Sequence, residues 1–421
     1  MENSYNSLHK HSQKVLLNGI MNALTKHKTK QELNMNNLKR NIAQYWDRIQ
    51  GQLFPCLEEI LGPLTNKHKQ LAIILEVVRI EEFIRTCNTC MGRPLADRCA
   101  IARAFIAKHI YNLPTTRSLI ERLEIDSRLR RICGWESKYR IPSESTFSRA
   151  FFEFASTDLP ARAHEALIKN AYKDEIVGHV SRDAAAIEAR EQPKSTYTNK
   201  KNSAEAIVKK TKTKDRPKAG EQRLEQEPTR IQKQLSMTLS EMVHNLPKDC
   251  DRGTKRNSKG YTECWNGYKI HIDTADSGVV LSAVLTSASV HDSQVAIPLA
   301  TMTANRVQNL YDLMDAAYDV KEIKDHSRKL NHVPLIDVNP RRDANLKEAI
   351  EAEAKARKAI NWKPAEAVRY NGRTVAEHSN GRLKDEFGGR TLRVKGHAKA
   401  FCHLMFGILI LSADQLMRIV L

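Results

Sequence analysis

The sequence predicts a chain of the α/β class, in which an all-helical N-terminal region precedes a domain built on a mixed β-sheet. Three observations lead to this prediction. From about residue 5 to residue 175, apolar residues recur at the spacing of amphipathic helices. From residue 176 the chain contains β-branched, alternating segments, two of which flank a hairpin turn. In the last third, strand-like and helix-like segments alternate, as in a sheet with crossover helices.

Five segments of the N-terminal region carry helix signals. They are residues 67–85, 98–110, 115–124, 126–132 and 143–155. Proline followed by threonine or serine opens two of them, and Gly134 stops another. The last three are short and closely spaced, and they carry Arg117, Arg122, Arg128, Arg130, Arg131 and Arg149. This arrangement resembles a DNA-binding helix-turn-helix region, although a helical bundle with arginines on its solvent face explains it as well.

The elements of the predicted sheet follow from residue 176. A strand at 176–190 contains Asp183, and two further strands at 266–274 and 278–290 flank Asp276-Ser277-Gly278, which has hairpin-turn chemistry. The later elements are a helix at 293–305, a strand at 309–314 that ends at Asp315, a helix at 318–330, a strand at 333–338, a helix at 346–358, a helix after Gly372 and an apolar helix from Ala398. This order matches a ribonuclease-H-like fold.

The chain is strongly basic. It has 68 lysines and arginines against 49 aspartates and glutamates, a formal net charge of +19, which favours a polyanionic partner such as nucleic acid or an anionic membrane surface. The densest basic run, at residues 209–218, lies in a polar insertion of about residues 190–260 and is either a solvated segment or a contact to a phosphate backbone. We therefore expect a helical domain at 1–175, a sheet domain at 176–395 that includes the insertion, and a C-terminal helix at 396–421.

Composition disfavours several other classes of protein. Hydrophobic residues make up 41% of the chain, enough for a sizeable core. No run of about eighteen uncharged apolar residues predicts a membrane span, and the N-terminus lacks a secretion signal. The apolar run near 401–411 is expected to be a core helix. Among eight cysteines, Cys87 and Cys90 form a CxxC without a second pair at zinc-finger spacing, which favours two reduced thiols on one helix.

Three acidic residues fall where function is expected. Asp183 lies in the first predicted strand and Asp315 ends the fourth, and open α/β sheets carry functional groups at such places. Each aspartate alone also fits a turn or a helix cap. In the segment YNGRTVAEHSNGRLK at 370–384, helical spacing places Arg373, Glu377 and Lys384 within about 40° of one another. Taken alone, this face is better explained as an ordinary ion pair with a neighbouring cation on a solvent-facing side of the helix.

The spacing Tyr-x2-Arg-x3-Glu-x6-Lys, formed by Tyr370, Arg373, Glu377 and Lys384, resembles the signature of insertion-sequence DDE transposases, in the bacterial superfamily named after insertion sequence four. Other blocks support the resemblance, which covers about residues 60–415. They are PSESTFSR at 142–149, Asp183-Ala184-Ala185-Ala186 without the family's threonine, Gly267-Tyr268-Lys269, Ala288-Ser289-Val290-His291-Asp292-Ser293, and DAAYD at 315–319 with Ala317 in place of glycine.

The resemblance implies cleavage and transfer of DNA strands. Asp183, Asp315 and Glu377 are then expected to bind two Mg²⁺ ions, for which Mn²⁺ can substitute, and one carboxyl is expected to have a raised pKa until a cation binds. Tyr370, Arg373 and Lys384 are expected to contact a terminal DNA phosphate. Asp292 is the alternative to Asp315, and His291 and Asp319 are expected to have local structural roles.

The resemblance also implies partners and location. We expect double-stranded DNA at the transposon ends and at the target, a homodimer or larger synaptic complex, and a cytoplasmic, nucleoid-associated protein with no membrane partner. Two alternative functions remain open. One is a catalytically decayed relative that binds DNA as a repressor, and the other is a ribonuclease-H-fold DNA nuclease without strand transfer.

Overall fold

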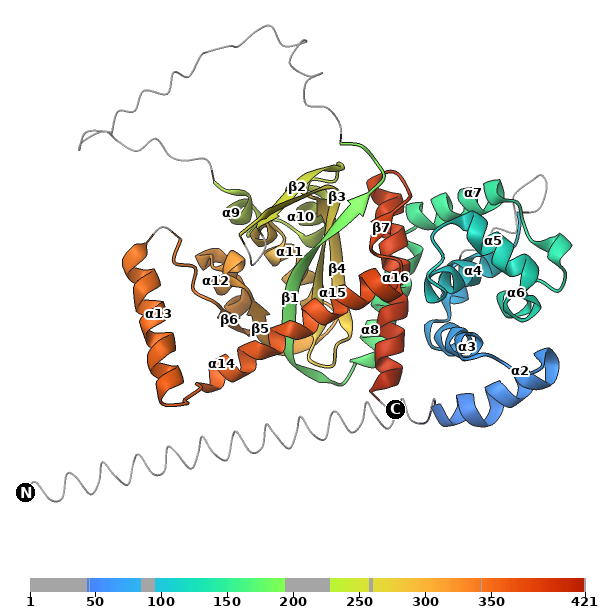
Figure 1. Cartoon of the computed structure of the whole chain (residues 1–421), viewed down its shortest axis with the longest axis horizontal. Helices are drawn as coiled ribbons and strands as arrows, with labels where there is room; N and C mark the ends of the chain where they lie inside the picture. Colours follow the sequence, from blue (N-terminus) through green and yellow to red (C-terminus); the bar gives the residue numbers. More distant parts are fainter. Residues whose placement is uncertain are drawn as a thin grey trace, which may run out of the picture.

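The computed structural model describes residue 44 and residues 46–84, 95–193, 228–256, 260–341 and 343–419. The basic run at 209–218 and the Cys87–Cys90 pair lie outside these ranges, so the predictions made for them stay predictions. The N-terminal helices, the sheet and the C-terminal helix pack against one another (Figure 1). A mostly helical N-terminal region followed by a mixed sheet is the arrangement that the sequence predicts.

The N-terminal region consists of short helices whose ends follow local sequence signals. They are the π-helix η1 (Ile49–Leu53), α2 (Phe54–Leu61), α3 (Asn66–Val78), the 3₁₀ turns η2 (Ile80–Phe83) and η3 (Lys138–Arg140), α4 (Arg98–Ile110), α5 (Thr116–Ile125), α6 (Ser127–Cys133), α7 (Glu144–Ser156) and α8 (Leu159–Ala171). Thr115 caps α5 by accepting a hydrogen bond of 3.0 Å from the amide of Ser118, and Asp126 caps α6 in the same way. The prediction of one helix over 67–85 is wrong beyond Val78, because Arg79 adopts a left-handed conformation that ends α3.

The sheet contains seven strands within the described ranges. They are β1 (Ile176–Ala189), β2 (Asp251–Arg256), β3 (Thr262–Ala275), β4 (Val280–Ser287), β5 (Gln308–Met314), β6 (Val333–Ile336) and β7 (Thr391–Leu392). The order is β2-β3-β1-β5-β6, with β4 paired to β3 and β7 paired to β1. β1 is antiparallel to β3 and parallel to β5, which is parallel to β6. This topology is consistent with the ribonuclease-H-like prediction.

A tight turn joins β3 and β4. Gly278 has φ +83° and donates its amide to the carbonyl of Ala275 at 2.9 Å. A side chain at Gly278 would be strained in this conformation and would also meet Gln415 at 3.0 Å. The hairpin predicted at Asp276-Ser277-Gly278 is therefore confirmed, and it pairs β3 with β4 in antiparallel register.

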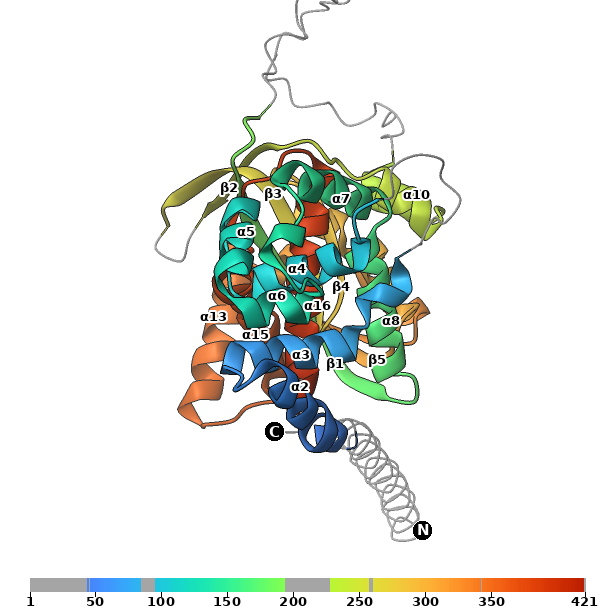
Figure 2. The same cartoon turned by 90° about the vertical axis from the view of Figure 1, so that its right-hand side faces the viewer.

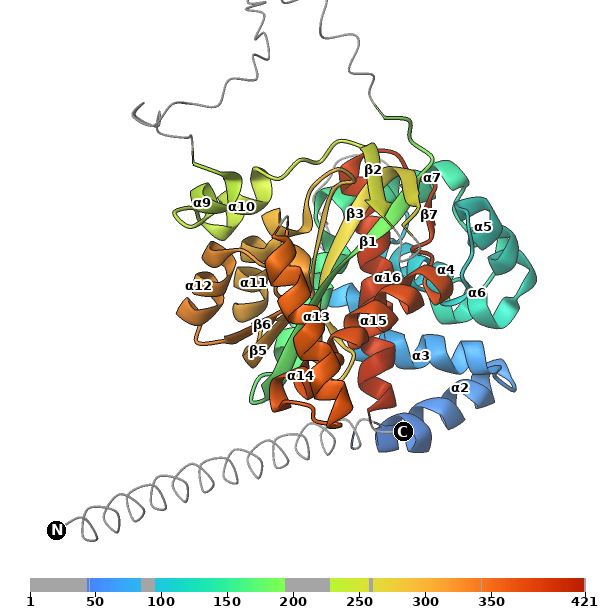
Figure 3. The same cartoon turned by 60° about the vertical axis from the view of Figure 1, so that its left-hand side comes forward.

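Helices connect the later strands and cover the sheet. They are α9 (Arg230–Gln234), α10 (Leu239–His244), η5 (Asp292–Gln294), α11 (Ala296–Ala304), η6 (Ala316–Tyr318), α12 (Lys321–Lys329), α13 (Ala344–Ala359), α14 (Ala365–Tyr370), η7 (Asn371–Arg373), α15 (Thr374–Glu386) and α16 (His397–Arg418). The helices predicted to begin at 293 and 318 begin later, because a 3₁₀ turn precedes each one. α15 crosses β1 and contacts both β1 and β3 (Figure 3).

The C-terminal helix α16 joins the N-terminal helices to the sheet (Figure 2). It contacts α3, α4, α7, α8 and β4, and one core cluster combines residues of all these parts, including Phe105, Ile272 and Phe406. Within the described residues, α16 is the one helix long and apolar enough to cross a membrane, but 78% of its most apolar window is buried inside the fold. Its apolar character is explained by its place in the core.

Candidate active site

Asp183 lies in the central strand β1, beneath α15. The side-chain amide of Asn380 on α15 donates a hydrogen bond of 2.9 Å to Asp183 Oδ2. Burial raises the pKa of the Asp183 carboxyl and the nearby charge of Glu377 adds to the rise, whereas the hydrogen bonds from Ala184 and Asn380 oppose it. The first predicted acid is therefore partly desolvated and is held in place by the helix that carries Glu377.

Asp315 follows β5, the parallel neighbour of β1. Ser181 is paired with Leu313, and continuing this register by two residues places Asp183 and Asp315 at the same level of the sheet. Asp315 Oδ1 accepts a hydrogen bond of 2.9 Å from the amide of Ala317 and so caps the turn η6. Burial raises the pKa of Asp315, and the charge of Asp292 raises it further. The Asp315 side chain therefore caps η6 and is also the side chain that the sequence predicts to bind metal.

Glu377 lies in the first turn of α15 and is paired with Arg373. Arg373 Nη2 lies 2.7 Å from Glu377 Oε1, and 49% of the Glu377 side chain is exposed. Burial opposes the charged form of Arg373, but the charges of Glu377, Tyr370 and Asp183 outweigh burial and raise its pKa. Arg373 also opposes the rise in the pKa of Asp315, so it lies within electrostatic reach of all three predicted acids.

Tyr370 and Lys384 lie at opposite ends of the same segment. The Arg373 guanidinium lies 5.9 Å from the centre of the Tyr370 ring. Burial and a hydrogen bond to Asp337 raise the pKa of Tyr370, so its hydroxyl stays protonated. Lys384 lies about two helical turns beyond Glu377. Its pKa is lowered by burial and by the charges of Lys255 and Arg390.

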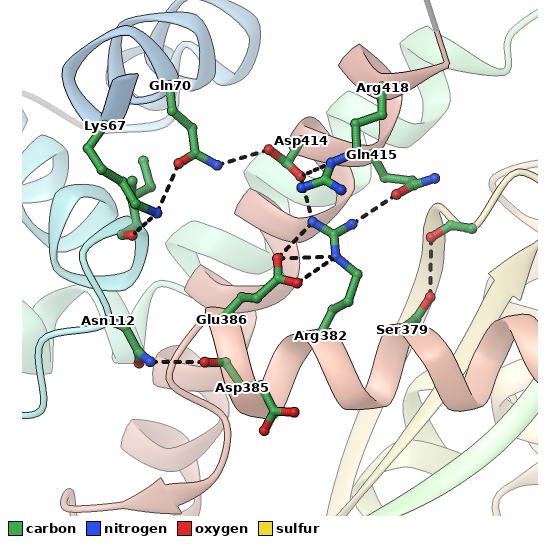
Figure 4. A network of polar contacts seen from close by, with 12 residues as sticks. Lys67, Gln70, Asn112, Ser379, Arg382, Asp385, Glu386, Asp414, Gln415 and Arg418 are labelled. Atoms are coloured by element: carbon green, nitrogen blue, oxygen red, sulfur yellow. Dashed lines mark hydrogen bonds and ion pairs between the residues drawn. The ribbon is translucent and has the colours of Figure 1, made fainter. Parts of the chain in front are cut away.

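A network of polar contacts fixes the C-terminal half of α15 (Figure 4). Arg382 pairs with Asp414 of α16 at 2.6 Å and with Glu386 at 2.9 Å. Asp414 in turn accepts a hydrogen bond of 2.9 Å from Gln70 of α3. Because these contacts join three helices, the helix that carries Glu377 is held by the N-terminal region as well as by the sheet.

The structure brings the three acids to one region without placing them in coordination geometry. Among the described residues, no three His, Cys, Asp or Glu side chains are close enough to hold a metal ion. The chemistry of the donor set nevertheless fits Mg²⁺, which prefers carboxylate oxygens. The hydroxyl of Tyr318 is also buried there, with no hydrogen-bond partner among the described residues, and burial and the charges of Asp292 and Asp183 raise its pKa. One carboxylate oxygen of Glu377 is occupied by Arg373 in this arrangement.

The neighbouring residues His291, Asp292 and Asp319 make local contacts. Asp292 forms an ion pair of 2.9 Å with Lys269, and His291 Nδ1 accepts from the amide of Ser293. Asp319 pairs with Lys324 and accepts a hydrogen bond from the amide of Asn339, and these contacts hold its pKa low although burial opposes them. Asp292, the predicted alternative to Asp315, is therefore already neutralised by a cation.

Sequence reasoning missed two residues of this region. Asn380 follows Glu377 by three residues, so helical spacing alone could have placed it on the same side of α15. Lys255 of β2 influences the pKa of Asp183, Asp315 and Lys384. No signal in the sequence marked Lys255, because the polar strand β2 was not predicted.

The arginines of the predicted helix-turn-helix region mostly bind within the N-terminal helices. Arg130 donates to the carbonyls of Leu123 and Glu124 at the end of α5. The other five contact protein atoms as well: Arg117 with Glu144, Arg122 with Asp126, Arg128 with Leu61, Arg131 with Glu136, and Arg149 with Thr146. These contacts agree with the bundle interpretation and leave the DNA-binding interpretation a prediction.

Two family models match parts of the chain. Residues 238–412 match the family model described as a transposase DDE domain, and residues 59–152 match a transposase domain (DUF772). The first match contains Tyr370, Glu377 and Lys384, whereas Asp183 lies outside both. DDE transposases generally use divalent metal ions. No curated protein and no solved structure matches the chain.

Proposed function

We propose that this chain, which contains two segments matched by transposase domains, is a bacterial DDE transposase of the insertion-sequence-four superfamily. It binds the terminal inverted repeats of its own insertion sequence and catalyses strand cleavage and strand transfer. Its catalytic domain is ribonuclease-H-like. The observation that carries the proposal is the placement of Asp183 and Asp315 at one level of neighbouring parallel strands, with Glu377 on the helix above them.

The three acids are the proposed ligands of the catalytic metal. Asp183, Asp315 and Glu377 together hold Mg²⁺, or Mn²⁺ in its place. When bound, the metal ions activate the attacking water or 3′-hydroxyl and stabilise the leaving oxygen of an in-line displacement. The raised pKa of Asp183 and of Asp315 supports this assignment, because desolvated carboxyls regain their charge when a cation arrives.

The cations and the phenol of the same segment are proposed to bind phosphates of the DNA backbone. Arg373 can present a planar fork to two phosphate oxygens, and Lys384 adds a point charge. Tyr370 keeps its proton and donates a hydrogen bond. Arg373 also holds Glu377 in the free protein, so binding of a phosphate by Arg373 releases the carboxylate for the metal.

The rest of the chain is proposed to bind DNA and to assemble the complex. Residues 1–175 form a DNA-binding domain, residues 176–395 form the catalytic domain with the basic insertion at about 190–260, and residues 396–421 form the C-terminal helix. The partners are duplex DNA at the ends and at the target, in a homodimer or larger synaptic complex. Transposases are typically soluble cytoplasmic proteins, and we propose the same location, with association to the nucleoid. The net charge of +19 supports a nucleic-acid partner.

Cleavage of the element's own ends tests the proposal. Duplexes that carry the inverted repeats flanking the coding region are incubated with the full chain and Mg²⁺, and nicked and joined products are separated on denaturing gels. Asp183→Asn and Glu377→Gln are expected to abolish both products and to retain binding. Asp325→Asn, which changes an exposed acid on α12, is the matched control.

The two alternative functions give different products. Binding of the inverted repeats without nicking in either metal identifies a decayed relative that acts as a repressor. Nicking without joined products identifies a nuclease that lacks strand transfer.

A further inference from the structure

A cationic cavity lies between the N-terminal helices and the end of α15. It has a volume of about 480 Å³ and is lined by the end of α4, the turn that leads into α5, and the segment from Lys384 to Val394. Its lining residues include five cations, namely Lys108, Arg190, Lys384, Arg390 and Arg393. The lining contains one carboxylate, Asp385, which is paired with Arg390. The cavity is therefore strongly positive.

Lys108 is the most unusual of these cations. The residue is only 6% exposed, and its ammonium group makes no hydrogen bond or ion pair with the described residues, although its backbone carbonyl accepts from the amide of Leu113. Burial and the charge of Arg393 lower its pKa to about 8. A buried ammonium group without a partner is unfavourable in a folded protein. Because Lys108 lines the cavity, an anion that enters the cavity could become its partner.

His109 provides a buried ring nitrogen that has no hydrogen-bond partner in the part of the chain that the structure describes. Its Nδ1 donates a hydrogen bond of 2.9 Å to the carbonyl of Phe105, which leaves the buried Nε2 as a free acceptor. Its ring lies 4.6 Å from that of His403, and His403 Nε2 donates to the carbonyl of Gly388 at 3.0 Å. A hydrated phosphate satisfies both unpartnered groups, with an oxygen for Lys108 and a water proton for His109.

The helix α5 begins at the same cavity. Thr115 and Thr116 line it, and Thr115 is the N-cap residue of this ten-residue helix. The N-terminus of a helix carries a partial positive charge and free amide groups, both of which favour phosphate. Asn112, in the turn before α5, donates a hydrogen bond of 3.0 Å to the carbonyl of Asp385 at the end of α15. This bond connects the two walls (Figure 4).

Lys384 connects the cavity to the candidate active site. It lines the cavity, and it lies seven residues after Glu377 on α15, a distance of about 10 Å along the helix axis. One DNA strand advances about 3.4 Å per nucleotide. A strand that runs from Glu377 along α15 therefore brings a phosphate to the cavity about three nucleotides from the reacting bond.

We propose that this cavity binds a backbone phosphate of the DNA strand that occupies the active site, and that the α4–α5 segment supplies part of that binding site. The inference rests on the proposed function for the identity of the strand. It also assigns to the segment matched by the second transposase domain a direct contact beside the chemistry.

The first test uses inorganic phosphate and thermal unfolding of the full chain in EDTA. Lys108→Met removes the charge and keeps a side chain of similar length. Without ligand, the variant is expected to unfold at the wild-type temperature or above, because it lacks the buried charge. Phosphate, compared with sodium chloride of equal ionic strength, is expected to raise the unfolding temperature of the wild type and of the control Lys169→Met, which changes an exposed lysine on α8, but not that of Lys108→Met.

The second test measures the salt dependence of duplex binding, also in EDTA, with the inverted-repeat duplex. Lys108→Met is expected to reduce the slope of log affinity against log salt by about one unit, and Lys169→Met is expected to leave it unchanged. A methylphosphonate is then placed at successive backbone positions near the cleaved end. At one backbone position the methylphosphonate is expected to lower the affinity of the wild type for the duplex. At the same position it should not lower the affinity of Lys108→Met, because the contact is already lost.

The outcomes separate this inference from the proposed function. The inference is overturned if Lys108→Met shows the same phosphate-induced rise in unfolding temperature and the same salt dependence of duplex binding as the wild type. Loss of phosphate binding with an unchanged duplex slope also overturns it, since the cavity then takes free phosphate and not DNA. Both tests are run without divalent metal and so do not depend on cleavage. If the wild type gives the expected results in both tests but never nicks DNA when Mg²⁺ is added, the proposed transposase activity is refuted and the cavity remains a DNA-phosphate site.

Discussion

The side-chain amide of Asn380 donates a hydrogen bond of 2.9 Å to the carboxylate of Asp183, and this bond links α15 to the central strand of the sheet. Asn380 is 6% exposed and its Oδ1 has no partner among the described residues. Two candidate metal ligands, Asp183 and Glu377, are therefore positioned by one helix-to-strand contact.

Replacing Asn380 by leucine is expected to weaken metal binding. The variant keeps the branched shape of the side chain in a somewhat larger volume but loses the bond that orients Asp183. Residues that orient metal ligands typically contribute about 10–100-fold to metal affinity. We expect the Mg²⁺ concentration for half-maximal nicking to rise by about this factor, with DNA affinity in EDTA unchanged. An unchanged Mg²⁺ requirement would show that the bond is purely structural.

Replacing Arg373 by lysine tests the role of its planar guanidinium. The charge remains, but a lysine cannot bind two phosphate oxygens as a fork. We expect the nicking rate at saturating DNA to fall about 10-fold or more, with a much smaller change in duplex affinity. Arg369→Lys, which changes an arginine over the Tyr311 ring at 3.8 Å, is the control. Equal losses in the two variants would argue against a specific phosphate contact.

The strand that carries Asp183 depends on a buried ion pair. Arg182 and Asp273, with side chains 2% and 0% exposed, lie 2.7 Å apart, and Thr303 donates a hydrogen bond of 2.6 Å to the same carboxylate. Asp273→Leu leaves the Arg182 charge unpaired and is expected to lower the free energy of unfolding by about 3–5 kcal/mol in urea. The double variant Arg182→Met with Asp273→Leu should recover most of this loss. If the single and double variants were equally unstable, the loss of stability would not come from an unpaired Arg182 charge.

Buried neutral histidines predict loss of stability in mild acid. Burial lowers the pKa of His271 to about 3, whereas an unfolded histidine titrates near 6.5. The unfolded state therefore binds more protons, and stability falls as the pH drops below about 6.5. Between pH 6.5 and pH 5, His271 alone contributes about 2 kcal/mol to this loss. His271→Asn should show a loss smaller by about that amount in urea titrations at the two pH values, and an identical loss would indicate that His271 titrates normally.

The sequence predicted elements whose signals are local. Thr115, Asp126 and Gly134 set the ends of α5 and α6, and Gly278 set the hairpin, because caps and left-handed turns depend on one or two residues. The end of α3 at Arg79 was missed because the apolar spacing continues past it. β2 was missed because it is a polar edge strand, in which Gly253 packs beneath the Trp265 ring of β3.

The candidate site was predictable only in part, because only some of its residues are related by local sequence spacing. Tyr370, Arg373, Glu377 and Lys384 share one segment, so helical spacing related them. The approach of Asp183 to Asp315 depends on the parallel register of β1 and β5, which residue types do not specify. In the sequence Lys108 is only one position of a predicted helix, whereas its place in a cationic cavity depends on α15 and on the segment that follows α15.

Mg²⁺-dependent cleavage of the inverted-repeat duplex by the wild type, Glu377→Gln and Asp325→Asn tests the central claim most directly. We expect nicked and joined DNA with the wild type and Asp325→Asn, and neither product with Glu377→Gln, while all three proteins bind the duplex. Wild-type amounts of product from Glu377→Gln would contradict the assignment of Glu377 as a metal ligand and, with it, the proposed active site.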